Sequence, residues 1–211
     1  MLARGDAAAA EADLTAALAL APAASEALLL RAEVHASQKR WDEAEKDLAT
    51  AIEKGADAAR SAEAQRLRSR IRAAAGRIED AAADLDALIA KDPNDRSLVL
   101  EKGTMLARAG RLDAALATAE KALVAEAKNS RFLLLRAEVL AAKGDADGAI
   151  RDATAALGVD AQLSEALALR GELQLKKGEK TKAAADFKQA MQMRPDLKAR
   201  LAPLLEEAEK P

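Results

Sequence analysis

The chain has 211 residues, a formal charge of −2 and no cysteine, which excludes a disulfide framework and a thiolate metal site. Its 33 basic and 35 acidic residues nearly balance, which argues against a general nucleic-acid-binding protein, because such proteins usually carry a basic excess. No apolar run approaches the ~20 residues that span a bilayer, so we expect neither membrane insertion nor a signal peptide. The composition fits cytoplasm and periplasm equally and leaves the compartment open.

The amino-acid composition predicts helices. Half of the residues are hydrophobic, yet only Trp41, Phe132 and Phe187 are aromatic. Alanine and leucine supply most of the rest and form helices readily, whereas the β-branched residues that favour strands are sparse. We therefore expect an all-α protein in which leucine packs against alanine. The abundance of alanine and arginine favours a bacterial origin.

An internal repeat organises the chain. The heptapeptide Leu28–Val34 occurs again, unchanged, as Leu133–Val139. When the two copies are overlaid, a glycine-rich column and an alanine column appear, with a step of 34 residues and one step of 37. Self-similarity of this length predicts a linear array in which each repeat contacts its neighbours. The columns are Gly5, Lys39, Gly76, Gly110, Gly144 and Gly178, and Ala10, Ala44, Ala81, Ala115, Ala149 and Ala183.

Hydrophobic periodicity and helix-breaking residues give the expected elements in chain order. Pro22 should end the first helix and Gly55 the third, and the three extra residues should lie within 56–61. Pro203 should kink the last helix or mark a restart. Ser25, Ser130 and Ser164 are the expected N-caps. The expected helices are 6–20, 26–38, 41–54, one that ends near 75, 78–91, 96–109, 112–125, 131–143, 146–157, 165–177, 180–193 and 197–209.

These features resemble a tetratricopeptide repeat (TPR) protein over almost the whole chain. The resemblance rests on the period of 34, the paired helices, the prolines that end units (Pro22, Pro93, Pro195) and small residues where helices cross. It implies a right-handed α-solenoid of stacked antiparallel helix pairs, the TPR superhelix. The small column on the first helices is Ala32, Ser69, Gly103, Ala137 and Gly171.

The register divides residues 1–211 into a single array. It opens with the second helix of a repeat, so we expect further sequence upstream of Met1. The expected parts are a half repeat 1–24, full repeats 25–58, 59–95, 96–129, 130–163 and 164–197, and a C-terminal capping helix 198–211.

A charged pair recurs with the repeat. In four repeats an arginine on the first helix precedes an aspartate on the second helix by 16 residues; in the fifth, Lys102 precedes Thr118. A guanidinium holds a carboxylate through two bonds, which lysine cannot do. We predict structural ion pairs between the helices of each repeat, the alternative being exposed pairs worth ~0–1 kcal/mol. The pairs are Arg31–Asp47, Arg68–Asp84, Arg136–Asp152 and Arg170–Asp186.

The sequence contains no catalytic constellation. His35 is the single histidine and lies on the packing side of its helix, where it makes a poor general base or metal ligand without cysteine. The glycines are isolated turn residues and form no phosphate loop. We therefore predict a non-enzymatic protein with no cofactor and no metal.

Function should then lie on the surface. The resemblance implies that first helices line a concave groove that receives a peptide or a partner's helix. Arg66 and Arg70 lie one helical turn apart, which predicts a basic middle for an acidic segment or a C-terminal carboxylate; ordinary solvated charges are an equal alternative. The candidates are Glu26, Leu29, Glu33, Arg66, Arg70, Leu100, Thr104, Arg108, Arg131, Leu134, Glu138, Glu165, Ala168 and Glu172.

Several functions compete at this point. The leading prediction is a protein–protein interaction scaffold with a protein or peptide partner. An alternative is the docking or regulatory part of a longer enzyme, or of a secretion or assembly component. A third is a homodimer formed through the N-terminal half repeat, whose Leu14 and Leu18 should be exposed. Leu29 and Glu33 depart from the lysines and asparagines of the subgroup that binds chaperone tails, so that specificity is not predicted.

Overall fold

The computed structural model describes residues 4–54 and 57–210. All regular secondary structure in these ranges is helical, which confirms the expected all-α class. The expected stop at Gly55 lies outside the described residues, as does part of the expected insertion at 56–61. The elements are α1 (Arg4–Leu20), α2 (Ser25–Ser37), α3 (Trp41–Lys54), α4 (Ala58–Ala74), α5 (Ile78–Lys91), α6 (Arg96–Arg108), α7 (Leu112–Ala125), α8 (Ser130–Ala142), α9 (Ala146–Val159), α10 (Ser164–Lys176), α11 (Lys180–Met193), the 3-10 turn η1 (Pro195–Leu197) and α12 (Lys198–Glu209).

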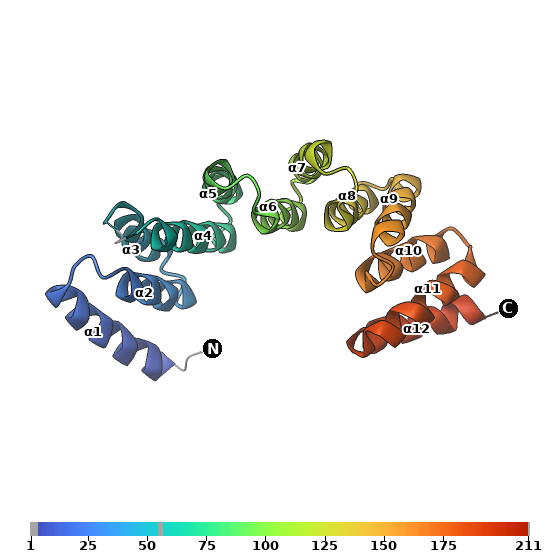
Figure 1. The fold of residues 1–211 in the computed structure, drawn as a ribbon. Coiled ribbons are helices and arrows are strands. Elements are labelled where there is room, and N and C mark those ends of the chain that lie inside the picture. Colours follow the sequence, from blue (N-terminus) through green and yellow to red (C-terminus); the bar gives the residue numbers. More distant parts are fainter. Residues whose placement is uncertain (1–3, 55–56, 211) are drawn as a thin grey trace. The chain divides into compact units, whose positions relative to one another are not determined.

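The helices form two compact units, 1–98 and 99–211, with the boundary inside α6. In unit 1 each helix from α1 to α5 packs against the next, and α2 also contacts α4 (Figure 1). The core of this unit is small and dense, since Ala44, Leu48 and Ala51 of α3 are fully buried against α2 and α4. Trp41 packs against the edge of this core.

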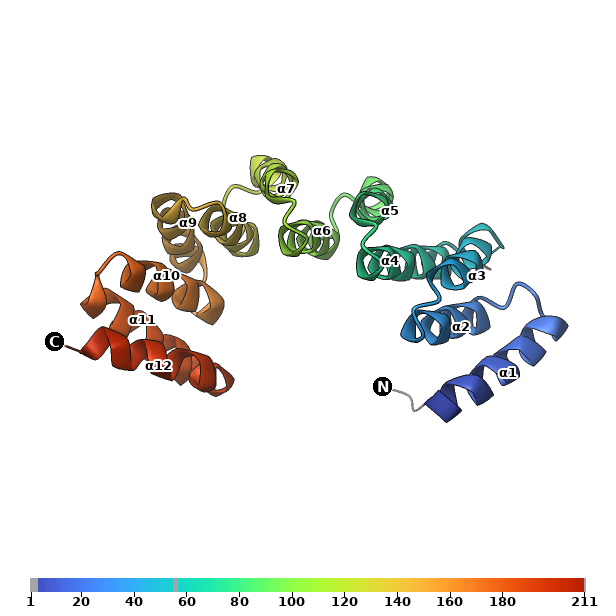
Figure 2. The same ribbon diagram turned by 180° about the vertical axis from the view of Figure 1, so that it is seen from behind.

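Unit 2 repeats the same arrangement. Each helix from α7 to α12 packs against the next, and α10 contacts both α8 and α12 (Figure 2). Phe132 and Leu133 centre one cluster, whereas Phe187 and Leu201 centre another under α12. The helix α12 runs through Pro203 without interruption, so the expected restart there is wrong. The break lies earlier, at η1.

The turn between the two helices of a repeat explains the glycine column. Gly76, Gly110, Gly144 and Gly178 all have φ between 73° and 88°, the left-handed region. Glycine has no Cβ and adopts this conformation without steric cost. Lys39 takes the same role with φ 61° and is the one non-glycine residue with positive φ among the described residues.

Charged pairs also connect successive repeats. In unit 1, Glu45 of α3 lies 3.0 Å from Arg72 of α4 and 2.7 Å from Arg77. In unit 2 the corresponding links are lysine–aspartate pairs, Lys143 with Asp113 and Lys177 with Asp147. The side chains of Asp113 and Asp147 are 94% and 67% exposed, whereas that of Glu45 is 18% exposed.

The helix starts differ from the expected caps. Ser25, Ser130 and Ser164 are the first residues inside their helices and do not cap them, because a cap needs the non-helical backbone of the residue before the helix. At α8 the cap is Asn129, whose Oδ1 accepts from the backbone N–H of Arg131 at 3.0 Å and of Phe132 at 3.2 Å. Asp57 and Asp145 cap α4 and α9 in a similar way.

The Asn129 cap yields a stability prediction. Replacing Asn129 with alanine should lower the free energy of unfolding by about 1 kcal/mol, because two backbone donors lose their acceptor. The control Ser130→Ala should change it by less than about 0.5 kcal/mol. Urea unfolding followed by circular dichroism measures both. A larger loss for Ser130→Ala would show that the serine, and not the asparagine, starts α8.

Candidate functional site

The four arginine–aspartate pairs bridge the two helices of their repeats. In each pair Nε of the arginine donates to one carboxylate oxygen and Nη2 donates to the other, at 2.6–3.0 Å. All four aspartates are buried. A planar guanidinium that meets a carboxylate through two parallel bonds fixes the distance and the angle between two helices. The pairs are Arg31–Asp47, Arg68–Asp84, Arg136–Asp152 and Arg170–Asp186.

The repeat 96–129 has no such ion pair, because it carries Lys102 and Thr118 at the two positions. Thr118 offers no carboxylate, and its hydroxyl donates to the carbonyl of Ala114 in its own helix at 2.8 Å. Asp84 differs in the opposite direction, because it accepts from Arg72 at 2.9 Å in addition to Arg68. Arg72 therefore links α4 to both α3 and α5.

His35 belongs to a structural network in unit 1. The His35 side chain is 7% exposed; Nε2 lies 3.2 Å from Oε1 of Glu11 on α1, and Nδ1 lies 3.6 Å from Oδ2 of Asp47 on α3. Arg40 donates to both oxygens of Glu11 at 2.8–2.9 Å, and this contact lowers the pKa of the Glu11 carboxyl. His35 thus helps to hold α1 against α2.

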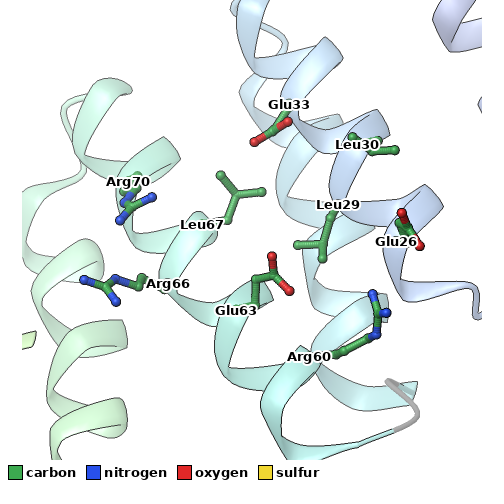
Figure 3. Close-up of a pocket in the computed structure, with 9 residues that line it drawn as sticks. All are labelled: Glu26, Leu29, Leu30, Glu33, Arg60, Glu63, Arg66, Leu67 and Arg70. Atoms are coloured by element: carbon green, nitrogen blue, oxygen red, sulfur yellow. The ribbon is translucent and has the colours of Figure 1, made fainter. Parts of the chain in front are cut away.

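The first candidate site is a pocket of about 340 Å³ in unit 1, between α2 and α4. In Figure 3, Arg66 and Arg70 lie on one side of it, Glu26 and Arg60 lie on the other, and Leu67 lies between them. Three leucines and three residues of each charge line this pocket. They are Leu29, Leu30, Leu67, Glu26, Glu33, Glu63, Arg60, Arg66 and Arg70.

The unit 1 pocket carries both charges. Carboxylates and guanidiniums line it in equal number, and Arg66 and Arg70 lie together on one side of it. The sequence interpretation missed Arg60, Glu63 and Leu67. Helical spacing could have found two of them, since Glu63, Arg66, Leu67 and Arg70 follow the i, i+3, i+4, i+7 pattern of one helix face. Leu30 was also missed and is 46% exposed.

The second candidate site is a pocket of about 390 Å³ in unit 2, formed by α6, α8 and α10. It brings together seven of the nine groove candidates predicted on these helices. Ala107 and Leu135 also line it and were missed, whereas the expected Ala168 and Glu172 do not line it. The seven are Leu100, Thr104, Arg108, Arg131, Leu134, Glu138 and Glu165.

Two carboxylates of the unit 2 pocket differ in their environments. Glu138 reaches solvent at the mouth, but the surrounding helices desolvate its carboxylate and raise its pKa, an effect that Arg108 opposes. Burial also acts to raise the pKa of Glu165, but hydrogen bonds from its own backbone N–H and from Ser164, with the charges of Arg131 and Arg194, outweigh it and lower that pKa.

The described residues were also compared with the requirements of a metal site and of a membrane-spanning helix. Within 4–54 and 57–210 no group of three or more histidine, cysteine or acidic side chains could hold a metal ion. None of the helices described is both long and apolar enough to cross a membrane.

The fold and the two pockets define a helical-repeat protein. Tetratricopeptide repeat models match residues 1–71, 66–131, 100–164 and 134–197, so the chain belongs to the tetratricopeptide repeat family. No curated protein matches the sequence.

Solved structures with the same fold share little sequence. The C-terminal part of a TPR protein from Cytophaga hutchinsonii is 14% identical, with a TM-score of 0.68, and the match covers 96% of this chain and 80% of that one. YrrB, described as a TPR protein with an unusual peptide-binding site, is 18% identical, with a TM-score of 0.55 and coverages of 90% and 96%. The first TPR domain of Spaghetti (RPAP3), bound to the HSP90 peptide SRMEEVD, is 19% identical, with a TM-score of 0.50 and coverages of 53% and 87%.

Proposed function

We propose that this chain is a non-enzymatic scaffold that binds an extended segment of a partner protein on the first helices of its repeats. The observation that carries the proposal is the pocket between α2 and α4, where exposed leucine lies beside ordered charges. The family, the peptide-binding site described for YrrB and the HSP90 peptide bound to RPAP3 support a peptide as the kind of ligand.

The unit 1 pocket suggests what the segment contains. Leu29, Leu30 and Leu67 form the apolar part of the lining. An apolar side chain of the partner that packed against them would be removed from water, which stabilises the complex. Arg66 and Arg70 lie at one end of this contact. A guanidinium binds a carboxylate through charge-assisted hydrogen bonds. We therefore propose a segment with an apolar residue followed or preceded by an acidic residue or the terminal carboxylate.

The unit 2 pocket offers a second contact of the same kind. Leu100 and Leu134 form its apolar part, and Arg108 and Arg131 are exposed at its rim.

Charge reversal at the arginine end tests this function. The variant Arg66→Glu/Arg70→Glu should weaken binding of a captured partner by about tenfold or more, since two attractive contacts become repulsive and 1.4 kcal/mol corresponds to a factor of ten. Affinity capture from the source organism, followed by titration of the captured partner, measures the change.

A matched control separates the local contact from net charge. Lys46→Glu/Lys54→Glu makes the same change in net charge at exposed positions of α3, away from the lining of the pocket. It should leave the affinity within about twofold. Equal affinity for the wild type and for the Arg66→Glu/Arg70→Glu variant would contradict the proposed site in unit 1.

A further inference from the structure

The two pockets share one piece of sequence. The heptapeptide Leu28–Val34 recurs as Leu133–Val139, and each copy contributes the same three positions to the pocket of its own unit. Because the glutamate follows the second leucine of the heptapeptide by four residues, the two side chains share one face of their helix. The three positions are Leu29, Leu30 and Glu33 in unit 1 and Leu134, Leu135 and Glu138 in unit 2.

We propose that this leucine–glutamate pair, Leu29 with Glu33 in unit 1 and Leu134 with Glu138 in unit 2, binds a lysine or arginine that stands beside an apolar residue in the partner's segment. The apolar side chain packs against the leucine, and the cation meets the carboxylate. This inference rests on the proposed function, since it requires that the pockets bind a segment of a partner. It goes further by naming a basic residue in that segment.

Glu138 carries the inference, because first helices on both sides of α8, namely α6 and α10, also line its pocket. Within the described ranges Glu138 accepts no hydrogen bond and forms no ion pair. The other carboxylate of this pocket, Glu165, accepts from the hydroxyl of Ser164 at 3.2 Å and pairs with Arg194 at 3.1 Å. Glu138 is therefore the carboxylate to which a ligand can still supply a donor.

The surroundings of Glu138 favour a cation as that donor. The helices desolvate its carboxylate and raise its pKa despite the opposing charge of Arg108. The charge of Arg108 thus offsets only part of the cost of desolvation. An ammonium or guanidinium group that bonded to Glu138 would replace the donors that water no longer supplies, and such charge-assisted hydrogen bonds are strong. The charge of Glu165 also acts on this position and adds to the attraction of a cation.

The arginines of the unit 2 pocket oppose this cation only weakly. Arg108 and Arg131 are exposed residues, and salt in the surrounding water screens exposed charges. The charge of Arg131 acts on Glu165 and lowers its pKa. A basic side chain therefore gains more at the desolvated Glu138 than it loses near the solvated guanidiniums.

The unit 1 pocket places the same pair opposite its arginines. Figure 3 shows Glu33 of α2 and Arg70 of α4 on opposite sides of Leu67. A basic residue at Glu33 and the acidic group proposed for Arg66 and Arg70 can therefore flank one apolar side chain of the segment. The segment bound in unit 1 would then carry opposite charges on the two sides of its apolar residue.

The predicted homodimer concerns a different surface. Leu18 of α1, expected to be exposed, is 7% exposed and belongs to the unit 1 core, which corrects the basis of that prediction. No residue of α1 lines either of the two pockets. The leucine–glutamate pairs are therefore separate from any contact that α1 makes.

A phage library of random twelve-residue peptides is the probe, since it requires no knowledge of the partner. Selection on the whole immobilised chain should enrich peptides with lysine or arginine within two residues of an apolar residue. Selection on Glu33→Gln/Glu138→Gln, which removes both charges and keeps the size of the side chains, should abolish the excess of basic residues. In fluorescence anisotropy a peptide selected on the wild type should bind this variant about tenfold more weakly, the loss expected for a charge-assisted contact.

Two controls separate the local contact from other effects. Glu206→Gln/Glu207→Gln makes the same change in net charge at exposed positions of α12, outside both linings, and should enrich the same peptides as the wild type. Replacing the selected lysine with norleucine should weaken binding to the wild type but not to Glu33→Gln/Glu138→Gln. Circular dichroism verifies that each variant is folded.

Two results would overturn this inference and leave the proposed function standing. One is a set of enriched peptides without an excess of basic residues, and the other is equal affinity of a selected peptide for the wild type and for Glu33→Gln/Glu138→Gln. A library that yields no enriched peptide would overturn the proposed function as well.

Discussion

Replacing Asp84 with alanine should destabilise unit 1 by about 3 kcal/mol, the low end of the range for removing one partner from a buried ion pair. The Asp84 carboxylate is 4% exposed and accepts from Arg68 and Arg72. Without it, two guanidiniums that are 20% exposed lose their acceptor while they stay packed between helices. Asp84 therefore matters more than the aspartates that hold a single arginine.

Trp41 allows this loss to be measured in unit 1 alone. It is the single tryptophan of the chain and packs against the unit 1 core, so its emission reports the unfolding of that unit in urea. The exposed Glu53→Ala serves as control and should change the free energy of unfolding by less than about 0.5 kcal/mol. An Asp84→Ala midpoint equal to that of the wild type would refute a stabilising role for the pair.

The Phe187→Ala substitution should cost about 3–5 kcal/mol in unit 2, the usual range for deleting a buried aromatic ring. Phe187 is fully buried between α10, α11 and α12. A Cβ added at Gly171 would lie 2.7 Å from Cε1 of Phe187, so the ring occupies the space that a side chain at position 171 would need. The cavity left by alanine has no side chain ready to fill it.

Circular dichroism is the measurement for unit 2, because Trp41 reports the other unit. Val124→Ala, at a position that is 88% exposed, should leave the midpoint nearly unchanged. The double variant Gly171→Ala/Phe187→Ala should recover part of the loss, since the added methyl group enters the vacated space. A loss below about 1 kcal/mol for Phe187→Ala would mean that the neighbouring helices collapse into the cavity.

The sequence predicts the helices and the helix pairs well because both depend on the repeat. Several second helices carry alanine at one register position and aspartate three residues later. Each of these helices packs against a first helix that carries an arginine and a small residue at fixed positions. The Arg–Asp spacing of 16 residues is therefore readable without coordinates. Phe187 and Gly171 show the limit: the columns give their register, but only the geometry shows that one fills the space of the other.

The helix starts and the pockets were harder to predict. Ser130 and Asn129 are adjacent and both can cap a helix, so the choice depends on which backbone is already helical. Leu18 was assigned to the open side of α1 because the period alone does not say how far α2 covers that helix. Glu63 lies on the same face of α4 as Arg66 and Arg70, so the mixed charge of that face follows only when all charged positions at helical spacing are considered together.

The links between repeats give the two units different responses to ionic strength. Arg72 and Arg77 reach a Glu45 side chain that is mostly shielded from water, and counterions screen such contacts weakly. The lysine–aspartate links of unit 2 stand in solvent, where added salt weakens exposed pairs that are worth ~0–1 kcal/mol each. Salt therefore loosens successive repeats in unit 2 more than in unit 1, so the pocket built across α6, α8 and α10 is the more adaptable of the two in a changing ionic environment.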